Sequence, residues 1–380
     1  MRKLQKEVQQ LRTELDEMGE ELDSAKAGGG GGGTTKMLLT GYTDTTFTDK
    51  ERSDSAFNTK FFPIFLWELD KRLLFEAELE VELGSSDTEV ALEFGDLTYI
   101  LNDYITFRAG KFMSPVSRFK EVLHPSWINK LPDQPLYATG SRRLIPTSSL
   151  GLEIRGGVPV GNDMKATYSV YSSNGPALKT GAGDAGRLNF KNNKDNNNNK
   201  AIGVAAGFFP MPNLEVGGSF QFSRVGASGS TFDDVDATLA SVNFHYQRES
   251  EHLKGSLEVL AEWLWSDADD ATYDPTGSAG FGPLTFDNER NGGYFQLSYR
   301  PEKVENEIFQ KLEGVIRYDA LNLPAASPGG IDESRITFGL NYPLGDSTIL
   351  KIAYQVDDIN DQSGTTEDAD ALLLQVTMGF

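Results

Sequence analysis

LLFEAELEVEL, residues 73–83, is the stretch that decides the fold of this chain. Apolar and charged residues alternate through it, and a period of two is the signature of a β-strand. One face carries Phe75, Ala77, Leu79, Val81 and Leu83, and the other carries Glu76, Glu78, Glu80 and Glu82. Four carboxylates cannot enter an apolar core without severe desolvation. The acidic face therefore needs water, and the other face needs a core or lipid; a soluble sheet with one wet face satisfies this strand alone.

The same alternation continues from about Lys36 to Phe380 and predicts sixteen strands. We place them at 36–48, 57–69, 72–83, 88–101, 104–112, 149–157, 164–172, 200–209, 213–224, 236–249, 254–266, 291–300, 308–319, 333–343, 347–357 and 369–380. Short turns follow every second strand, whereas most of the other connections are long and polar. A soluble sandwich has no reason to sort its loops in this way, but an outer-membrane barrel does. The sequence therefore predicts an all-β fold, a 16-stranded antiparallel transmembrane β-barrel over 36–380.

The N-terminal segment has a different pattern. Residues 1–26 carry a narrow apolar seam that predicts an α-helical coiled coil. The seam consists of Leu4, Val8, Leu11, Leu15, Met18 and Leu22. An amphipathic helix docked on its own barrel is the alternative. Residues 27–35 contain an unbroken glycine run and predict a flexible linker. A secretory leader ahead of such a barrel is expected to have been removed.

Composition excludes several classes of function. No run of about 18 apolar residues is present, as a transmembrane helix would require, whereas an alternating barrel has the hydropathy of a soluble protein. The net charge of −21 argues against a nucleic-acid partner. Cysteine is absent, and His124, His245 and His252 neither pair at ligand spacing nor lie beside a serine in an elbow motif. We therefore expect no metal, no cofactor and no enzymatic activity.

Residues Glu93–Pro115, EFGDLTYILNDYITFRAGKFMSP, resemble the phosphate-selective porin family. Arg108, Gly110, Lys111 and Pro115 match its RxGKxxxP-like motif, and 146–157 fits the returning strand. The rows of channel arginines and lysines found in that family are absent, so phosphate specificity is not implied. A coiled coil ahead of the barrel is similar to the sucrose- and dicarboxylate-specific porins, which implies a homotrimer with its coils in the periplasm. The final strand ends on Phe380 and resembles the recognition signal of the bacterial barrel-assembly machinery.

The longest connection, residues 113–148, is apolar enough to fold into the barrel and form a constriction. Its charges are Arg118, Lys120, Lys130, Arg142 and Arg143 against Glu121 and Asp133. On the wall, alternation points Arg108, Arg155, Arg317, Arg335 and Lys351 inward, opposite Glu76, Glu78, Glu80, Glu82, Glu93, Glu153, Glu258, Glu262 and Glu313. Facing arrays of opposite charge would create a transverse field and set ion preference. Alternatively, these groups pair with one another and keep the lumen wet. The sign of the preference stays open.

These patterns favour passive diffusion of small hydrophilic solutes through the bacterial outer membrane. The expected partners are outer-membrane lipid, lipopolysaccharide, further copies of the chain, and peptidoglycan or a periplasmic protein reached by the coil. A structural tether acting through the coil is the alternative function. A barrel enzyme lacks a displayed nucleophile and base, and a sheath for an electron carrier has no haem motif to support it.

Overall fold

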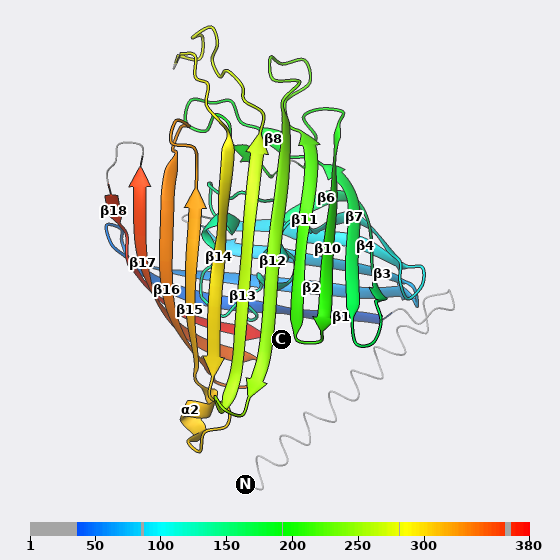
Figure 1. Cartoon of the computed structure of the whole chain (residues 1–380), viewed down its shortest axis with the longest axis vertical. Coiled ribbons are helices and arrows are strands. Elements are labelled where there is room, and N and C mark those ends of the chain that lie inside the picture. Colours follow the sequence, from blue (N-terminus) through cyan, green and yellow to red (C-terminus); the bar gives the residue numbers. More distant parts are fainter. Residues whose placement is uncertain (1–35, 85–86, 192, 281, 362–365) are drawn as a thin grey trace.

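The computed structural model of the chain describes residues 36–84, 87–191, 193–280, 282–361 and 366–380. Within these residues, sixteen long antiparallel strands form one closed barrel (Figure 1). They are β1 Lys36–Lys50, β2 Ala56–Asp70, β3 Leu73–Leu83, β4 Thr88–Ile100, β5 Thr106–Met113, β6 Ser148–Pro159, β7 Lys165–Asn174, β10 Lys200–Met211, β11 Leu214–Arg224, β12 Asp236–Ser250, β13 Gly255–Ala268, β14 Glu289–Arg300, β15 Glu313–Asn322, β16 Ile331–Pro343, β17 Thr348–Asp361 and β19 Ala371–Gly379. This confirms the predicted barrel. The predicted coiled coil and linker lie outside the described residues.

The barrel closes between its first and last strands. β1 pairs with both β2 and β19, so Tyr42 lies opposite Phe62 on one side and Gly379 on the other. Phe380 extends the seam, because its backbone N–H donates to the carbonyl of Gly41 at 3.0 Å and its carbonyl accepts from the Gly41 N–H at 3.1 Å. Closure removes the unpaired edges that would otherwise recruit other strands.

The barrel is polar inside and apolar outside. In β19, Leu372, Leu374, Val376 and Met378 point outward and are exposed. Between them Gln375 and Thr377 point inward and are buried at 2% and 0% exposure. This reverses the arrangement of a soluble protein, in which apolar side chains face the interior. It is the pattern expected when lipid surrounds the outer face.

The connections are sorted by end, as the sequence predicts. For the upright strands β7–β17 in Figure 1, the short turns lie at the lower end and the long connections at the upper end. Two short strands, β8 Ala177–Leu178 and β9 Leu188–Asn189, pair within one of these upper connections, and β18 Thr366–Asp368 extends the last hairpin. No helix among the described residues is both long and apolar enough to cross a membrane.

One predicted strand needs correction. The expected strand 308–319 is a short helix, α2 Glu307–Lys311, followed by β15, which begins at Glu313. Asn306 caps the helix, because its side-chain oxygen accepts from the N–H groups of Ile308 and Phe309 at 3.0 and 3.2 Å. Asparagine is among the strongest N-cap residues, and Glu307 in the first turn suits the helix dipole. These local signals outweigh the strand pattern before Glu313.

The connection after β5 folds into the barrel. It contains a π-helical turn, η1 Phe119–Leu123, and a 3₁₀ turn, η2 Leu136–Ala138. Its apolar side chains pack against inward-facing residues of the wall in one cluster. Phe119, for example, meets Tyr294 of β14 edge-on at 5.8 Å between ring centroids. This part of the lumen is therefore filled by the loop, and the open space lies along the opposite wall.

Candidate functional site: the channel interior

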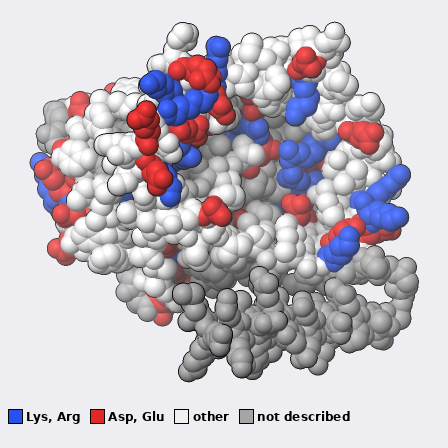
Figure 2. Space-filling view, turned by 90° about the horizontal axis from the view of Figure 1, so that it is seen from below, with Lys and Arg blue, Asp and Glu red and all other residues white. Residues whose placement is uncertain are grey.

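Two large cavities lie inside the described part of the barrel. The larger has a volume of about 1100 Å³ and opens between the outer halves of β1–β6 and the long connections. The smaller, of about 540 Å³, is bounded by the ends of β3–β7, β10 and β11 that carry the short turns. Seen from that end, the molecule is hollowed, with basic and acidic side chains side by side around the opening (Figure 2). The lumen is thus wide at both ends.

The turn η1 separates the two cavities. Lys120 and His124 line the larger one, whereas Arg118 and Glu121 line the smaller one. β3 passes the same level, with Glu76 on the smaller cavity and Glu80 on the larger. Glu78 lies between them at 1% exposure; it accepts from the Tyr42 hydroxyl at 3.3 Å and lies 3.9 Å from His124. Glu78 and η1 therefore lie at the level that separates the two cavities.

Glu262 of β13 fixes η1 to the wall. Its carboxylate accepts from the backbone N–H groups of Arg118 at 2.7 Å and Phe119 at 3.0 Å. The hydroxyls of Tyr137 and Ser117 donate to it as well, at 2.7 and 3.2 Å. Glu262 is 2% exposed, and such burial is tolerated only because several donors satisfy the charge. The sequence placed Glu262 among the lumen acids, and the structure places it beneath the loop.

A second set of ion pairs ties the far side of the loop. The Lys130 ammonium lies 2.8 Å from the Glu258 carboxylate and 2.5 Å from that of Glu313. Asp133 pairs with Arg317 at 2.7 Å and with Arg335 at 3.2 Å. These wall residues face inward, as alternation requires, but their charges are neutralised by the loop and by neighbours on the wall.

Lys351 completes this attachment. Its ammonium donates to the carbonyl of Asn129 at 2.6 Å and also to that of Ser126. It is 1% exposed. The buried ammonium therefore holds the backbone of the loop and does not face the open lumen.

The smaller cavity holds a balanced network. Arg108 bridges Asp96 at 3.6 Å and Glu153 at 3.3 Å. Arg155 lies 3.0 Å from Glu121. Arg118 lies 2.9 Å from Glu215. Acids and bases pair between neighbouring strands and between the loop and the wall, so the smaller cavity is polar without a strong net charge.

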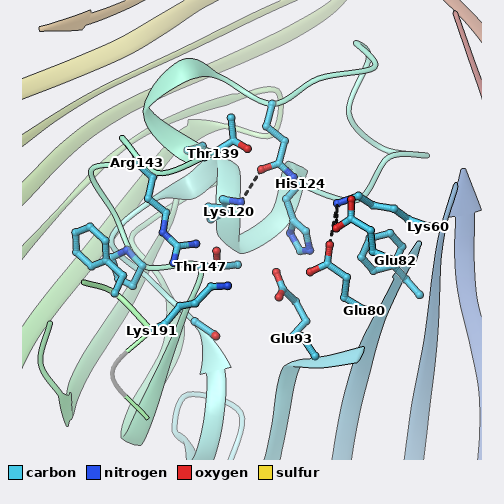
Figure 3. Close-up of a pocket in the computed structure, with 18 of the residues that line it drawn as sticks. Lys60, Glu80, Glu82, Glu93, Lys120, His124, Thr139, Arg143, Thr147 and Lys191 are labelled. Atoms are coloured by element: carbon cyan, nitrogen blue, oxygen red, sulfur yellow. Dashed lines mark hydrogen bonds and ion pairs between the residues drawn. The ribbon is translucent and has the colours of Figure 1, made fainter. Parts of the chain in front are cut away.

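The larger cavity is unbalanced. On its acidic side Lys60 lies between Glu80 and Glu82, at 2.9 and 3.0 Å, and its single charge offsets one of these two carboxylates (Figure 3). Among the described lining residues, four cations have no carboxylate within 4.0 Å, and two carboxylates have no cation within that distance. The cations are Lys111, Lys120, Arg143 and Lys191, and the carboxylates are Asp44 and Glu93.

The geometry of this cavity separates charge across the opening. Figure 3 shows Arg143, Lys120 and Lys191 on one side and Glu93, Glu80 and Glu82 on the other. Burial lowers the pKa of Lys120 to about 8, the neighbouring Glu93 opposing this effect. Burial also lowers the pKa of Arg143. The remaining predicted loop cation, Arg142, lies 3.4 Å from Glu333, above this site.

Sequence reasoning missed Lys60 and Lys191 and gave Lys111 only as part of a motif. Lys60 lies on the inward face of β2, so alternation could have found it. Lys191 lies in the connection between β7 and β10, and nothing local indicates that this residue turns into the lumen.

No known family profile and no curated protein sequence match this chain. Solved structures do. The outer-membrane channel DcaP of Acinetobacter baumannii superposes with a TM-score of 0.58 at 11% identity, covering 91% of this chain and 97% of that one. An anion-selective porin from Comamonas acidovorans gives 0.57 at 13% identity, with 91% and 100% covered. Salmonella typhi OmpF in complex with daunomycin gives 0.56 at 13% identity, with 91% and 98% covered. Identities this low show the fold alone, and the 16-stranded fold of this chain is like that of these outer-membrane channels and porins.

Proposed function

We propose that the chain is an outer-membrane porin for passive diffusion of small hydrophilic or ionic solutes, constricted by the loop 113–148. The observation that carries this proposal is the loop itself, which is tied across the interior of a closed barrel and leaves a polar cavity on either side. A barrel of sixteen strands is wide enough for an aqueous channel. A loop that sealed the barrel completely would not leave these two open cavities.

The outer face of the barrel indicates which molecules surround it. The apolar band fits outer-membrane lipid, and the long loops fit the lipopolysaccharide side. We further propose a homotrimer, with residues 1–26 as a periplasmic coiled coil that reaches peptidoglycan or a periplasmic protein. Phe380 would serve as the barrel-assembly signal. No enzymatic activity is proposed.

We propose that the channel prefers anions. The four unpaired cations of the larger cavity exceed its three uncompensated negative charges, which are those of Asp44, of Glu93 and of one carboxylate of the Glu80–Glu82 pair. Selectivity is set where the lumen narrows. Their charges act over short range, since the Debye length is about 10 Å at 0.1 M salt. The net charge of −21 for the whole chain does not oppose this, because the exposed loop carboxylates are screened from the constriction.

Single-channel recording tests both statements. The detergent-purified full chain, inserted into a planar bilayer under a potassium chloride gradient, is expected to give conductance steps and an anion-preferring reversal potential. Closure in three equal steps would support the trimer. A barrel that inserts but stays silent would overturn the diffusion proposal and favour the tether.

The ion preference is expected to depend on pH through Lys120. Because burial lowers the pKa of the Lys120 ammonium to about 8, this group is charged at pH 6 and neutral at pH 9.5. Anion preference should therefore fall as pH rises, with half of the change near pH 8. Reversal potentials measured from pH 6 to 9.5 check this.

Two variants of Lys120 make the pH experiment specific. Lys120→Gln should lose the titration and Lys120→Arg should keep the charge throughout. An unchanged titration in Lys120→Gln would assign the effect to another group.

A further inference from the structure

A very small cavity lies at the outer mouth beside the larger one. It has a volume of about 10 Å³ and is lined by the tip of the inward loop, the connection between β7 and β10, and the inner faces of β13 and β14. Four guanidinium side chains line it: Arg142, Arg143, Arg187 and Arg290. No carboxylate is among its lining residues. We call these four residues the arginine cage.

The charge of the arginine cage is largely uncompensated. Arg142 lies 3.4 Å from Glu333. For the other three, no carboxylate of the described residues lies within 4.0 Å. Burial and the nearby charge of Arg142 both lower the pKa of Arg187. Like charges held together in partly dry surroundings repel strongly, so the fold needs a counter-charge at this point.

The guanidiniums are held in place rather than left to spread apart. Arg290 is 5% exposed, and its Nε and one terminal nitrogen donate to the side-chain oxygen of Asn288 at 3.0 and 2.9 Å. The Asn288 amide in turn donates to the carbonyl of Gly186 at 2.9 Å. Arg290 therefore cannot swing away from the cavity to relieve the repulsion.

Arg187 is held by backbone carbonyls and has one N–H group without an acceptor. Its terminal nitrogen donates to the carbonyls of Pro328 and Gly329 at 3.2 Å each. Its Nε is buried and has no acceptor. A buried donor without a partner is rare enough to need an explanation, and an acceptor seated in the cavity supplies one.

We propose that the arginine cage binds one small monatomic anion, of the size and charge of chloride. A volume of about 10 Å³ admits about one water-sized particle, which is too little to bury a whole phosphate or carboxylate group. Water would leave the positive charge uncompensated, whereas a halide accepts from several guanidiniums at once. The bound anion would join the inward loop to the connection between β7 and β10. This site goes beyond solute diffusion and does not depend on it.

Thermal unfolding of the detergent-solubilised full chain tests the proposal. Potassium chloride replaces potassium gluconate at constant ionic strength, because gluconate is too large for the cavity. The unfolding midpoint is expected to rise and then saturate, as for a ligand that binds only the folded state. The double variant Arg187→Gln/Arg290→Gln should lose most of this rise. Arg224→Gln, which removes a guanidinium that pairs with Asp236 outside the cage, should keep it.

Several outcomes would overturn the proposal. These are no rise in the unaltered chain, an equal rise in the double variant, or a larger response to phosphate than to chloride. If the double variant does not fold, crystals of the unaltered chain soaked in bromide give an independent answer. An anomalous peak between Arg187 and Arg290 supports the site, and its absence excludes it.

Discussion

Replacing Glu262 with alanine is expected to release the inward loop and raise the single-channel conductance. The substitution removes the one acceptor shared by four donors: two backbone N–H groups and the hydroxyls of Ser117 and Tyr137. A buried donor left unpaired costs roughly 1–3 kcal/mol, so we expect the loop to lose about 3 kcal/mol of attachment even after partial rehydration. η1 would keep only its ion pairs to Glu215 and Arg155, and Lys130 and Asp133 would hold the far side of the loop.

Conductance and limited proteolysis measure this release together. In Glu262→Ala we expect larger, noisier conductance steps and cleavage after Arg118 or Lys120, which the native loop resists. Glu249→Ala is the matched control, since Glu249 lies near the exposed end of the neighbouring strand β12. Unchanged conductance and protease resistance in Glu262→Ala would show that the other contacts suffice to hold the loop.

Reversing two charges at the larger cavity is expected to invert the ion preference. Arg143→Glu with Lys191→Glu changes the lining by four unit charges on the basic side of the opening. At about 10 Å and an effective dielectric constant of about 20, each unit charge is worth roughly 1–2 kcal/mol to a passing ion. Because 1.4 kcal/mol is tenfold, the anion-to-cation permeability ratio should fall by roughly tenfold or more.

The reversal potential under a salt gradient reports this inversion directly. Lys179→Glu with Lys200→Glu is the matched control, because these lysines pair with Asp184 and Asp195 on the outer surface and line neither of the two large cavities. The control should keep the native sign at 0.1 M salt. If both double variants shifted the potential equally, the preference would come from the charge of the whole outer surface and not from the constriction.

The barrel could be predicted from sequence because its determinant is local. In β3 and β19, each side chain's face follows from its position along the strand. The alternation of short and long connections then favoured a membrane barrel over a soluble sheet. The error at 308–311 has the same origin, since a local cap at Asn306 overrode a weak alternation.

The site could be predicted only in part. Alternation placed Arg317, Arg335, Lys351 and Glu262 on the inward face, but it could not say that the loop would take up their charges. Asp133 meets Arg317 across 184 positions of sequence, and no local pattern encodes such a contact. Lys191 and Arg290 are likewise brought to the lumen by folding.

The sequence by itself therefore determined that this protein is a sixteen-stranded barrel with a wet interior, because strand periodicity and loop lengths are properties of neighbouring residues. Only the tertiary structure decided which charges remain free to act on a passing ion. Closing the barrel brings a loop and a wall together from distant parts of the chain, and at a few ångströms each charge is neutralised by whatever partner the fold sets beside it.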